Sequence, residues 1–392
     1  MSDLFDTLAT DATRDTTAML RTLAASLRER RRWHALFDLR LLEARAALGL
    51  PISGDLSMVD PAHRDVLDER SLAACREVGW PLLDEGAVAA GWMYLRAAAE
   101  PEAVAGKLRE LAARLPADDE AAETRRQEIV HVALWEGIDP ALGLEVVLAS
   151  QGTCNAITAY EQAVARLPAA RQQSAAALLV DHLHRDVMEN LRADLDRRGL
   201  LPADARPATI PDLLEAVGGL TDDPNVHIDV SHLQSVLRIA RVATARDVID
   251  KAWELAVYAC RLPADVTYPG EPPFENVGEA SRLFFGAQFG RDPEAAVRFF
   301  RAAAVKARIE QADSLPADIL VLLLWRLGRP AEALHAALER PTDGGMPSLV
   351  QTSGMVPSLL ELARKGDALD VLRAACRARG DEITFAATFL SG

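Results

Sequence analysis

Apolar positions along the chain recur at helical spacing, and the breaks between them recur at a nearly constant interval. The clearest breaks lie near the C-terminus, where Gly290, Gly328 and Gly366 follow one another every 38 residues. Each glycine ends one apolar stretch and precedes another. Glycine suits the left-handed position just past a helix end, and proline suits the first turn of the next helix. The pattern predicts helical hairpins, in which two helices are joined by a tight turn.

A similar interval appears in the N-terminal half, where an acidic residue precedes a proline. Asp60-Pro61, Glu100-Pro101 and Asp139-Pro140 lie 40 and 39 residues apart. Proline fits the first helical turn, and an acidic residue before it is stabilised by the positive end of the helix dipole. A period of about 38–40 residues at both ends of the chain is typical of a helical-hairpin solenoid.

The middle of the chain interrupts this period. The sequence predicts a long helix from Pro168 to Arg198, a helix pair over about Ser231 to Arg261, and a proline-rich loop from Tyr268 to Glu275. Such a loop is stiff and loses little entropy on ordering, and long loops in compact arrays are often functional. We therefore predict three parts: helical hairpins over 1–150, an irregular helical section with a candidate ligand pocket over 151–280, and regular hairpins over 281–392.

Composition supports an all-α fold. Ala, Leu and Arg, which are strong helix formers, dominate every long segment, and alternating runs of β-branched residues are absent. The 392 residues exceed the ~250–300 that one core usually supports. The sequence therefore predicts an array in which each unit packs on its neighbours. The expected fold is an all-α, right-handed α-solenoid of stacked helical hairpins with an irregular central section.

One segment resembles a known repeat family. Leu322 to Glu339, LLLWRLGRPAEALHAALE, resembles the core of a tetratricopeptide-type (TPR) repeat, in which a turn glycine precedes a helix carrying an Ala-Leu pair. The resemblance is clearest over 280–392 and fainter over 30–150. It implies a concave surface that binds another protein or a peptide.

The charge, the cysteines and the apolar segments of the chain indicate which classes of partner and which cellular compartment to expect. A net charge of −15 opposes nucleic-acid binding, which needs a basic surface, and the basic run Arg28 to Arg32 is interpreted as a solvated helix face. The four cysteines form no CxxC pair, which fits a reducing compartment. The first twenty residues contain four Asp and no apolar signal region. The longest apolar run, Ile319 to Trp325, is far shorter than the ~20 residues that cross a bilayer. We expect a cytoplasmic protein without nucleic-acid or membrane partners.

Histidines are the one compositional anomaly, because five of the eight fall between positions 131 and 232. His182 and Asp186 share a helix face. Ser231 to Gln234 fits a capping box, which predicts a helix start at Ser231 with His232 in its first turn. Two or three histidines with a carboxylate suit zinc or iron. The candidate metal ligands are His182, His227, Asp229 and His232. The alternative is that these histidines are hydrogen-bonded groups where helices meet.

Other polar residues interrupt the apolar pattern and are candidate ligand-binding groups. The small polar residues from Gly152 to Thr158 stand where the repeat would place Leu and Ala, and Thr153 is expected to cap the next helix. Glu136 precedes the turn glycine Gly137, and Glu271 and Glu275 lie in the proline-rich loop. The candidate ligand-binding residues are His131, Glu136, Asn155, Thr158, Glu271 and Glu275.

Two functional hypotheses remain open at this level. The first is a non-catalytic scaffold whose helical array binds a protein or peptide. The alternative is a metal-dependent or small-molecule-binding enzyme with its pocket in the His-rich central section. No GxSxG, HExxH or phosphate-binding glycine loop occurs, so no enzyme class is indicated.

Overall fold

The computed structural model is all-α. It describes residues 4–52, 59–116, 119–201, 208–216, 226–340 and 348–390, and every regular element within these ranges is a helix. The predicted absence of sheet is thus confirmed for that part of the chain. Two compact units are formed, Met1–Val146 and Val147–Gly392, here called unit 1 and unit 2. The first predicted boundary, at 150, lies beside this division, whereas the second, at 280, lies inside unit 2.

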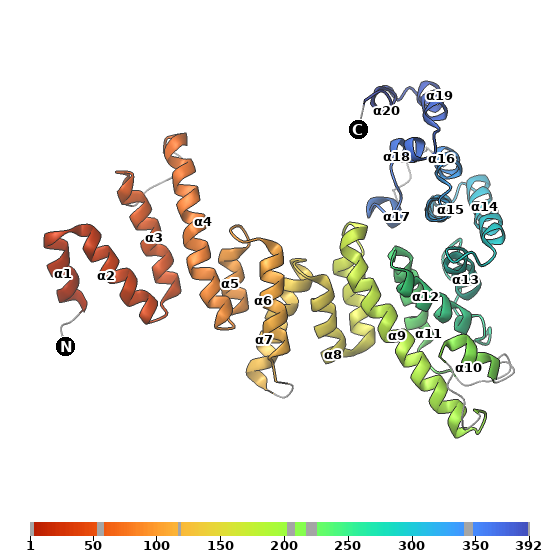
Figure 1. The fold of residues 1–392 in the computed structure, drawn as a ribbon, viewed down its shortest axis with the longest axis horizontal. Coiled ribbons are helices and arrows are strands. Elements are labelled where there is room, and N and C mark those ends of the chain that lie inside the picture. Colours follow the sequence, from red (N-terminus) through yellow and green to blue (C-terminus); the bar gives the residue numbers. More distant parts are fainter. Residues whose placement is uncertain are drawn as a thin grey trace. The chain divides into compact units, whose positions relative to one another are not determined.

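Unit 1 is a series of helices in which most pack on their neighbours in the chain (Figure 1). The division between the units falls within the last of them. In order, the elements are α1 (Leu4–Arg14), α2 (Thr16–Glu29), α3 (Trp33–Ala47), α4 (Pro61–Asp84), α5 (Val88–Leu95), α6 (Pro101–Ala113), α7 (Glu120–Val130), a π-helical turn (His131–Trp135) and α8 (Pro140–Ala159).

The three acid–proline pairs begin helices as predicted. Pro61, Pro101 and Pro140 are the first residues of α4, α6 and α8. The Asp60 carboxylate accepts a hydrogen bond from the Ala62 amide at 2.8 Å, and Asp139 accepts one from the Leu142 amide at 3.2 Å. These carboxylates satisfy amide groups that have no partner inside the helix.

The core of unit 1 runs along the series of helices. Leu82 of α4 packs in a buried cluster with residues of α2, α3 and α5, including Leu36 and Tyr94. The next residue, Leu83, packs in a second cluster that includes Val104 and Leu108 of α6. Helix α4 therefore buries two faces, one toward each neighbouring group of helices.

An ion-pair network joins three helices of unit 1. The Glu77 carboxylate on α4 accepts hydrogen bonds from Arg28 of α2 and from Arg40 of α3, the latter at 2.8 Å. Arg31 pairs with Glu85 at 3.5 Å. Arg28 of the basic run thus pairs with an acid of α4, and Arg31 pairs with Glu85, the residue that follows α4. The bond from Arg40 is the main reason that the pKa of Glu77 lies below its usual value, and Arg28 adds to this effect.

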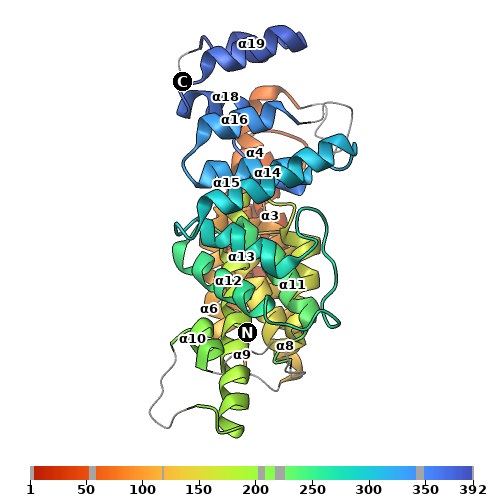
Figure 2. The ribbon, with the colours of Figure 1, turned by 90° about the vertical axis from the view of Figure 1, so that its right-hand side faces the viewer.

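Over the described residues, unit 2 continues from α8 through a π-helical turn (Tyr160–Val164) into helices of which most again pack on chain neighbours, and Figure 2 shows α13, α16, α18 and α19 one above another in that order. The predicted long helix and helix pair are confirmed. The elements are α9 (Ala169–Arg197), α10 (Ile210–Ala216), α11 (Val230–Ile239) with a 3-10 turn (Ala240–Val242), α12 (Arg246–Ala259), α13 (Val277–Ala287), α14 (Pro293–Ile309), α15 (Leu315–Arg326), α16 (Pro330–Leu338), α17 (Leu349–Thr352), α18 (Leu359–Lys365), α19 (Leu369–Arg379) and α20 (Glu382–Ala387).

The three predicted turns occur, but the third glycine has a different role. Gly290 and Gly328 adopt left-handed φ angles of 76° and 69°, as expected past a helix end. Gly366 has a φ of −93°, and the left-handed residue is its neighbour Asp367. A Cβ atom on Gly366 would lie 2.6 Å from the amide nitrogen of Ala331. Glycine is needed there because the turn touches α16.

Ion pairs connect successive hairpins on α14 and α16. Arg301 pairs with Glu332 at 3.0 Å, and Arg308 pairs with Glu339 at 3.4 Å. Glu294 also pairs with Arg329. These side chains are partly exposed, so each pair adds little stability, but together they favour one alignment of the two helices.

A buried polar cluster holds the start of α15. The Asp318 side chain is fully buried and accepts hydrogen bonds from Ser348 Oγ at 2.6 Å and Gln351 Nε2 at 3.0 Å. Arg340, which follows α16, places Nε 2.7 Å from the same carboxylate. Burial raises the pKa of Asp318 above its usual value, an effect that the Arg340 charge opposes. One carboxylate thereby links α15, α16 and α17.

Replacing Glu77 with Gln is expected to lower the free energy of unfolding at pH 7 by about 1 kcal/mol, since hydrogen bonds to partly exposed charges are weak. Because the folded state depresses the pKa of Glu77, this stabilisation is present above the ordinary carboxyl pKa and is lost as the pH falls through the folded value. Urea unfolding at pH 7 and pH 3 measures it. Glu69→Gln, on an exposed position of α4, is the control. If Glu77→Gln lowered the free energy of unfolding equally at pH 7 and pH 3, the stabilisation could not come from the ionised Glu77 carboxylate.

Replacing Asp318 with Ala is expected to lower the free energy of unfolding by about 3 kcal/mol, because the change leaves the Arg340 charge buried without a partner. Urea denaturation checks the value. Asp370→Ala, which removes a carboxylate that is 95% exposed, is the matched control and is expected to change stability by less than about 0.5 kcal/mol. Equal effects of the two substitutions would show that the buried cluster adds nothing.

Candidate functional site

Helix α9 carries the second and third histidines of the predicted cluster, His182 and His184, on different faces. His182 Nε2 lies 2.9 Å from the hydroxyl of Thr153 and 3.2 Å from Asp186, its predicted neighbour on the same face. Thr153 was expected to cap a helix, but its hydroxyl instead contacts His182 on a neighbouring helix. The chain bends at Gly152, whose φ of 82° interrupts α8 just before Thr153.

His184 faces the opposite way and joins α9 to two other helices. Its Nε2 lies 2.8 Å from Oε2 of Glu254 on α12, and the Ile210 amide at the start of α10 donates to the same oxygen at 2.9 Å. Glu254 is 7% exposed. A buried carboxylate with two donors is a satisfied group, so this contact is an interhelical joint.

His227 lies in a second buried joint. Its ring is 5% exposed, with Nε2 3.2 Å from Asp194 of α9 and Nδ1 3.1 Å from the hydroxyl of Tyr258 on α12. The hydrogen bond to His227 is the main cause of the lowered pKa of Asp194, to which Arg198 also contributes. The order carboxylate, imidazole, phenol resembles a proton relay, but Tyr258 is fully buried and no substrate could reach it.

Asp229 caps helix α11, which corrects the predicted helix start at Ser231. The Ser231 amide and hydroxyl both donate to Asp229 Oδ1, at 2.8 and 2.6 Å, and the helix begins at Val230. A carboxylate is a stronger acceptor at the positive helix end than a hydroxyl. These bonds lower the pKa of Asp229, with the Ser231 hydroxyl as the largest cause. His232 lies in the first turn, as expected.

Three of the four predicted metal ligands therefore have partners outside the predicted set, and the fourth, His232, lies beside Asp229 in the first turn of α11. His182 contacts Thr153, His227 contacts Asp194, and Asp229 caps a helix. Across the ranges that the structure describes, no group of three or more His, Cys, Asp or Glu side chains is arranged to hold a metal ion. His182, His184 and His227 instead lie where helices meet.

The predicted ligand-binding residues lie in different places. His131 and Glu136 come together in unit 1, with 3.7 Å between Nε2 and Oε1 across the exposed π-helical turn. Asn155 and Thr158 bond back to backbone carbonyls four residues earlier on α8, at 2.9 and 3.0 Å. Such local bonds satisfy polar side chains without creating a site.

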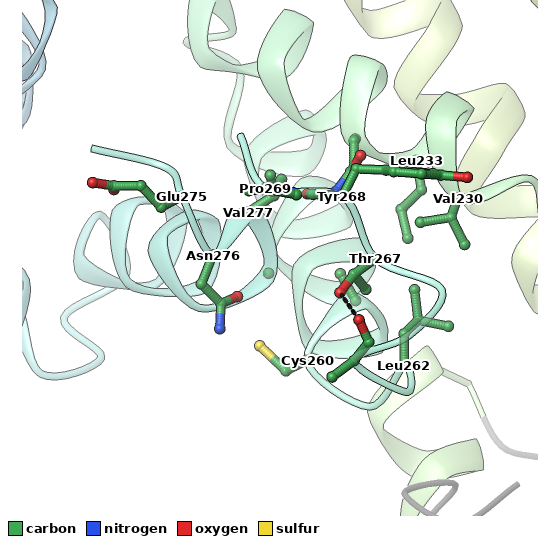
Figure 3. A pocket seen from close by; sticks show the side chains of 14 residues that line it. Val230, Leu233, Cys260, Leu262, Thr267, Tyr268, Pro269, Glu275, Asn276 and Val277 are labelled. Atoms are coloured by element: carbon green, nitrogen blue, oxygen red, sulfur yellow. Dashed lines mark hydrogen bonds between the residues drawn. The ribbon is translucent and has the colours of Figure 1, made fainter. Parts of the chain in front are cut away.

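Glu271 and Glu275 belong to the proline-rich loop, which lines a pocket in unit 2. The pocket has a volume of about 350 Å³ and lies between α11, the segment after α12, this loop and the start of α13. Figure 3 shows that the Cys260 thiol and the Asn276 amide lie near each other, while the Glu275 carboxylate points away from the other labelled side chains. The residues that line this pocket are Val230, Leu233, Gln234, Ala259, Cys260, Leu262, Ala264, Thr267, Tyr268, Pro269, Glu275, Asn276, Val277 and Gly278.

Hydrogen bonds fix the loop across α11. Gln234 Nε2 donates to the carbonyl of Tyr268 at 2.6 Å, and the Gly270 amide donates to the carbonyl of Glu275 at 3.1 Å. Gly270 approaches the Phe274 carbonyl so closely that a Cβ atom would lie 2.3 Å from it. The loop is therefore a preformed wall, and its Tyr268 side chain remains 64% exposed at the pocket.

Two arginines that contact each other, the buried Arg241 and the half-buried Arg326, were not anticipated from the sequence. Arg241 is 9% exposed and stacks on Phe274, with 3.4 Å between its guanidinium carbon and the ring centroid. Arg326 Nη2 donates to the backbone carbonyl of Arg241 at 2.7 Å. Burial lowers the pKa of Arg241 to about 9 and that of Arg326 to about 10. Periodicity alone gives no signal for them, because Arg is usually a solvated helix residue.

No protein-family model, curated protein sequence or solved structure matches the chain. A search of the described helices for a span long and apolar enough to cross a bilayer also gives none.

Replacing His227 with Ala is expected to lower the thermal midpoint and the free energy of unfolding by about 2 kcal/mol, because it leaves Asp194 and Tyr258 without their shared buried partner. His232→Ala, half-buried in the first turn of α11, is expected to have a much smaller effect. Differential scanning calorimetry with and without EDTA provides the measurement, and EDTA is expected to change neither protein. Stoichiometric zinc or iron that both substitutions release would instead support the metal hypothesis.

Proposed function

We propose that the protein is a helical-repeat scaffold that binds a segment of a partner protein, with the pocket beside the proline-rich loop as its binding site. The proposed arrangement is a right-handed α-solenoid of TPR-like hairpins. Its support is the 38-residue turn spacing, the packing of helices on chain neighbours, and the ion pairs that join α14 to α16.

The observation that carries the proposal is the pocket itself. Its volume of about 350 Å³ lies at the small end of the range for ligand sites, which suits one or two inserted side chains. Its wall combines apolar groups such as Leu233 and Val277 with the exposed Tyr268 ring. Tyrosine on a stiff loop offers a large contact area with little loss of entropy, and such residues are enriched where partners bind.

The polar groups of the pocket fit binding better than catalysis. Gln234 and Thr267 donate to backbone carbonyls, and Asn276 caps α13 by accepting from the Glu279 amide. No histidine is among the lining residues. The pocket thus contains no paired general acid and base, which an enzyme hypothesis based on the central histidines would need.

The charge of the chain favours a protein partner. The net charge of −15 repels a polyphosphate backbone, whereas a protein segment brings apolar side chains and local charges of either sign. A solenoid also exposes continuous helix surfaces that suit an extended peptide.

Binding can be tested with peptides selected from a displayed 12-residue random library on the full-length protein. Tyr268→Ala is expected to weaken the selected peptides at least about tenfold, because it removes a central aromatic contact. Cys260→Phe is expected to weaken them similarly by filling the pocket. Fluorescence anisotropy gives the affinities, and Ile383→Ala, at a position 83% exposed on α20, is the control. Selected peptides whose affinity is unchanged by both pocket substitutions would refute this site, and a selection that yields no peptide would refute the proposal.

A further inference from the structure

Arg241 has an unusual environment for a charged side chain. It is 9% exposed, and its Nε is buried without a hydrogen-bond partner. Within the described part of the chain, no hydrogen bond or ion pair is formed by this guanidinium. The guanidinium instead stacks on the ring of Phe274. Buried charges are normally paired, because desolvation costs more than one stacking contact returns.

The surroundings of Arg241 have an excess of positive charge. The half-buried Arg326 donates to its backbone carbonyl, and the charge of Arg238 lies close enough to lower the pKa of Arg241 further. Arg238 is itself paired with Glu161. Glu271 is the acid whose charge acts on Arg241, but the two form no ion pair and Glu271 is exposed to solvent. Among the residues that the structure describes, no acid forms an ion pair with Arg241, although the chain as a whole has a net charge of −15.

The same helix face connects Arg241 to the pocket. Gln234, Arg238 and Arg241 stand at positions i, i+4 and i+7 along α11 and its 3-10 turn, which places them on one stripe. Gln234 lines the pocket and binds Tyr268, while Arg241 lies under Phe274. The proline-rich loop therefore covers the stripe at both ends.

We propose that the Arg241 guanidinium binds a carboxylate of the partner segment, and this inference rests on the proposed peptide-binding function. The planar guanidinium offers parallel N–H donors that match the two oxygens of a carboxylate. The ligand class is thus an acidic peptide, anchored by an Asp or Glu side chain or by its C-terminal carboxylate. Phe274 holds the guanidinium plane in place for this contact.

A purely structural role is the competing explanation, in which Arg241 only supports the loop through Phe274. The two explanations differ in their response to carboxylates. A binding site gains stability from an added carboxylate, because a ligand that binds only the folded state raises the melting temperature. A structural stacking contact has no such response.

The test measures thermal unfolding of the full-length protein in 50 mM sodium glutarate against sodium chloride of equal ionic strength. Glutarate is expected to raise the midpoint of the wild-type protein by about 3 °C. Arg241→Met is expected to abolish the shift. Arg246→Met is the matched control, because Arg246 also stacks on a phenylalanine but is exposed, and it is expected to keep the full shift.

Glu271→Gln provides a second variant that does not depend on the folding of Arg241→Met. Removing this nearby acid is expected to lower the glutarate concentration at half-maximal shift about twofold. A wild-type protein that ignores glutarate, or an Arg241→Met protein that keeps the full shift, would overturn the proposal. An equal shift in sodium phosphate would overturn the assignment to carboxylates. Since no peptide is used, the result is independent of the library selection, so failure of this site and failure of the scaffold function are distinguishable.

Discussion

Most of the described helices depend on their neighbours to bury their apolar surface. Helix α4 shows the constraint most clearly, because adjacent residues Leu82 and Leu83 pack into two different buried clusters. A helix with two apolar faces is stable only when both are covered. The chain meets this requirement by packing most helices on those that precede or follow them, which is the physical logic of repeat proteins. Stability is therefore distributed over many joints between helices.

Buried polar groups are concentrated at these joints. Glu254 receives donors from α9 and α10, and Asp318 receives them from residues that follow α16. A carboxylate with donors from two elements fixes how those elements align, because a shifted helix would leave the charge unsatisfied. Apolar contacts tolerate small shifts of one helix along another, whereas hydrogen-bonded buried carboxylates do not. They help to explain how short helices with similar Ala- and Leu-rich faces pack in one register.

Features set by local sequence could be predicted, and those set by distant partners could not. The acid–proline pairs fixed three helix starts, and Gly290 and Gly328 marked two turns, because caps and left-handed positions involve neighbouring residues. The cap of α11 was misassigned to Ser231, since Asp229 competes for the same amide groups. The histidines were singled out as unusual and the pairing of His182 with Asp186 was predicted, but the interhelical partners of His182, His184 and His227 lie 29 to 70 residues away in sequence. The buried charges of Arg241 and Asp318 carried no local signal at all.

The proline-rich loop connects the two parts of the proposed binding site. Its first residues line the pocket, and its Phe274 covers Arg241. A group that enters the pocket and one that binds the guanidinium would thus contact the same short, stiff segment. The stiffness of the loop favours binding. A flexible loop would lose conformational entropy when it is ordered by a partner, whereas a preformed loop is already ordered. If the bound loop conformation is shared by both contacts, each stabilises the other, and the coupling is reciprocal by thermodynamic necessity. A short acidic peptide with one apolar anchor can then bind more tightly than either contact alone would allow.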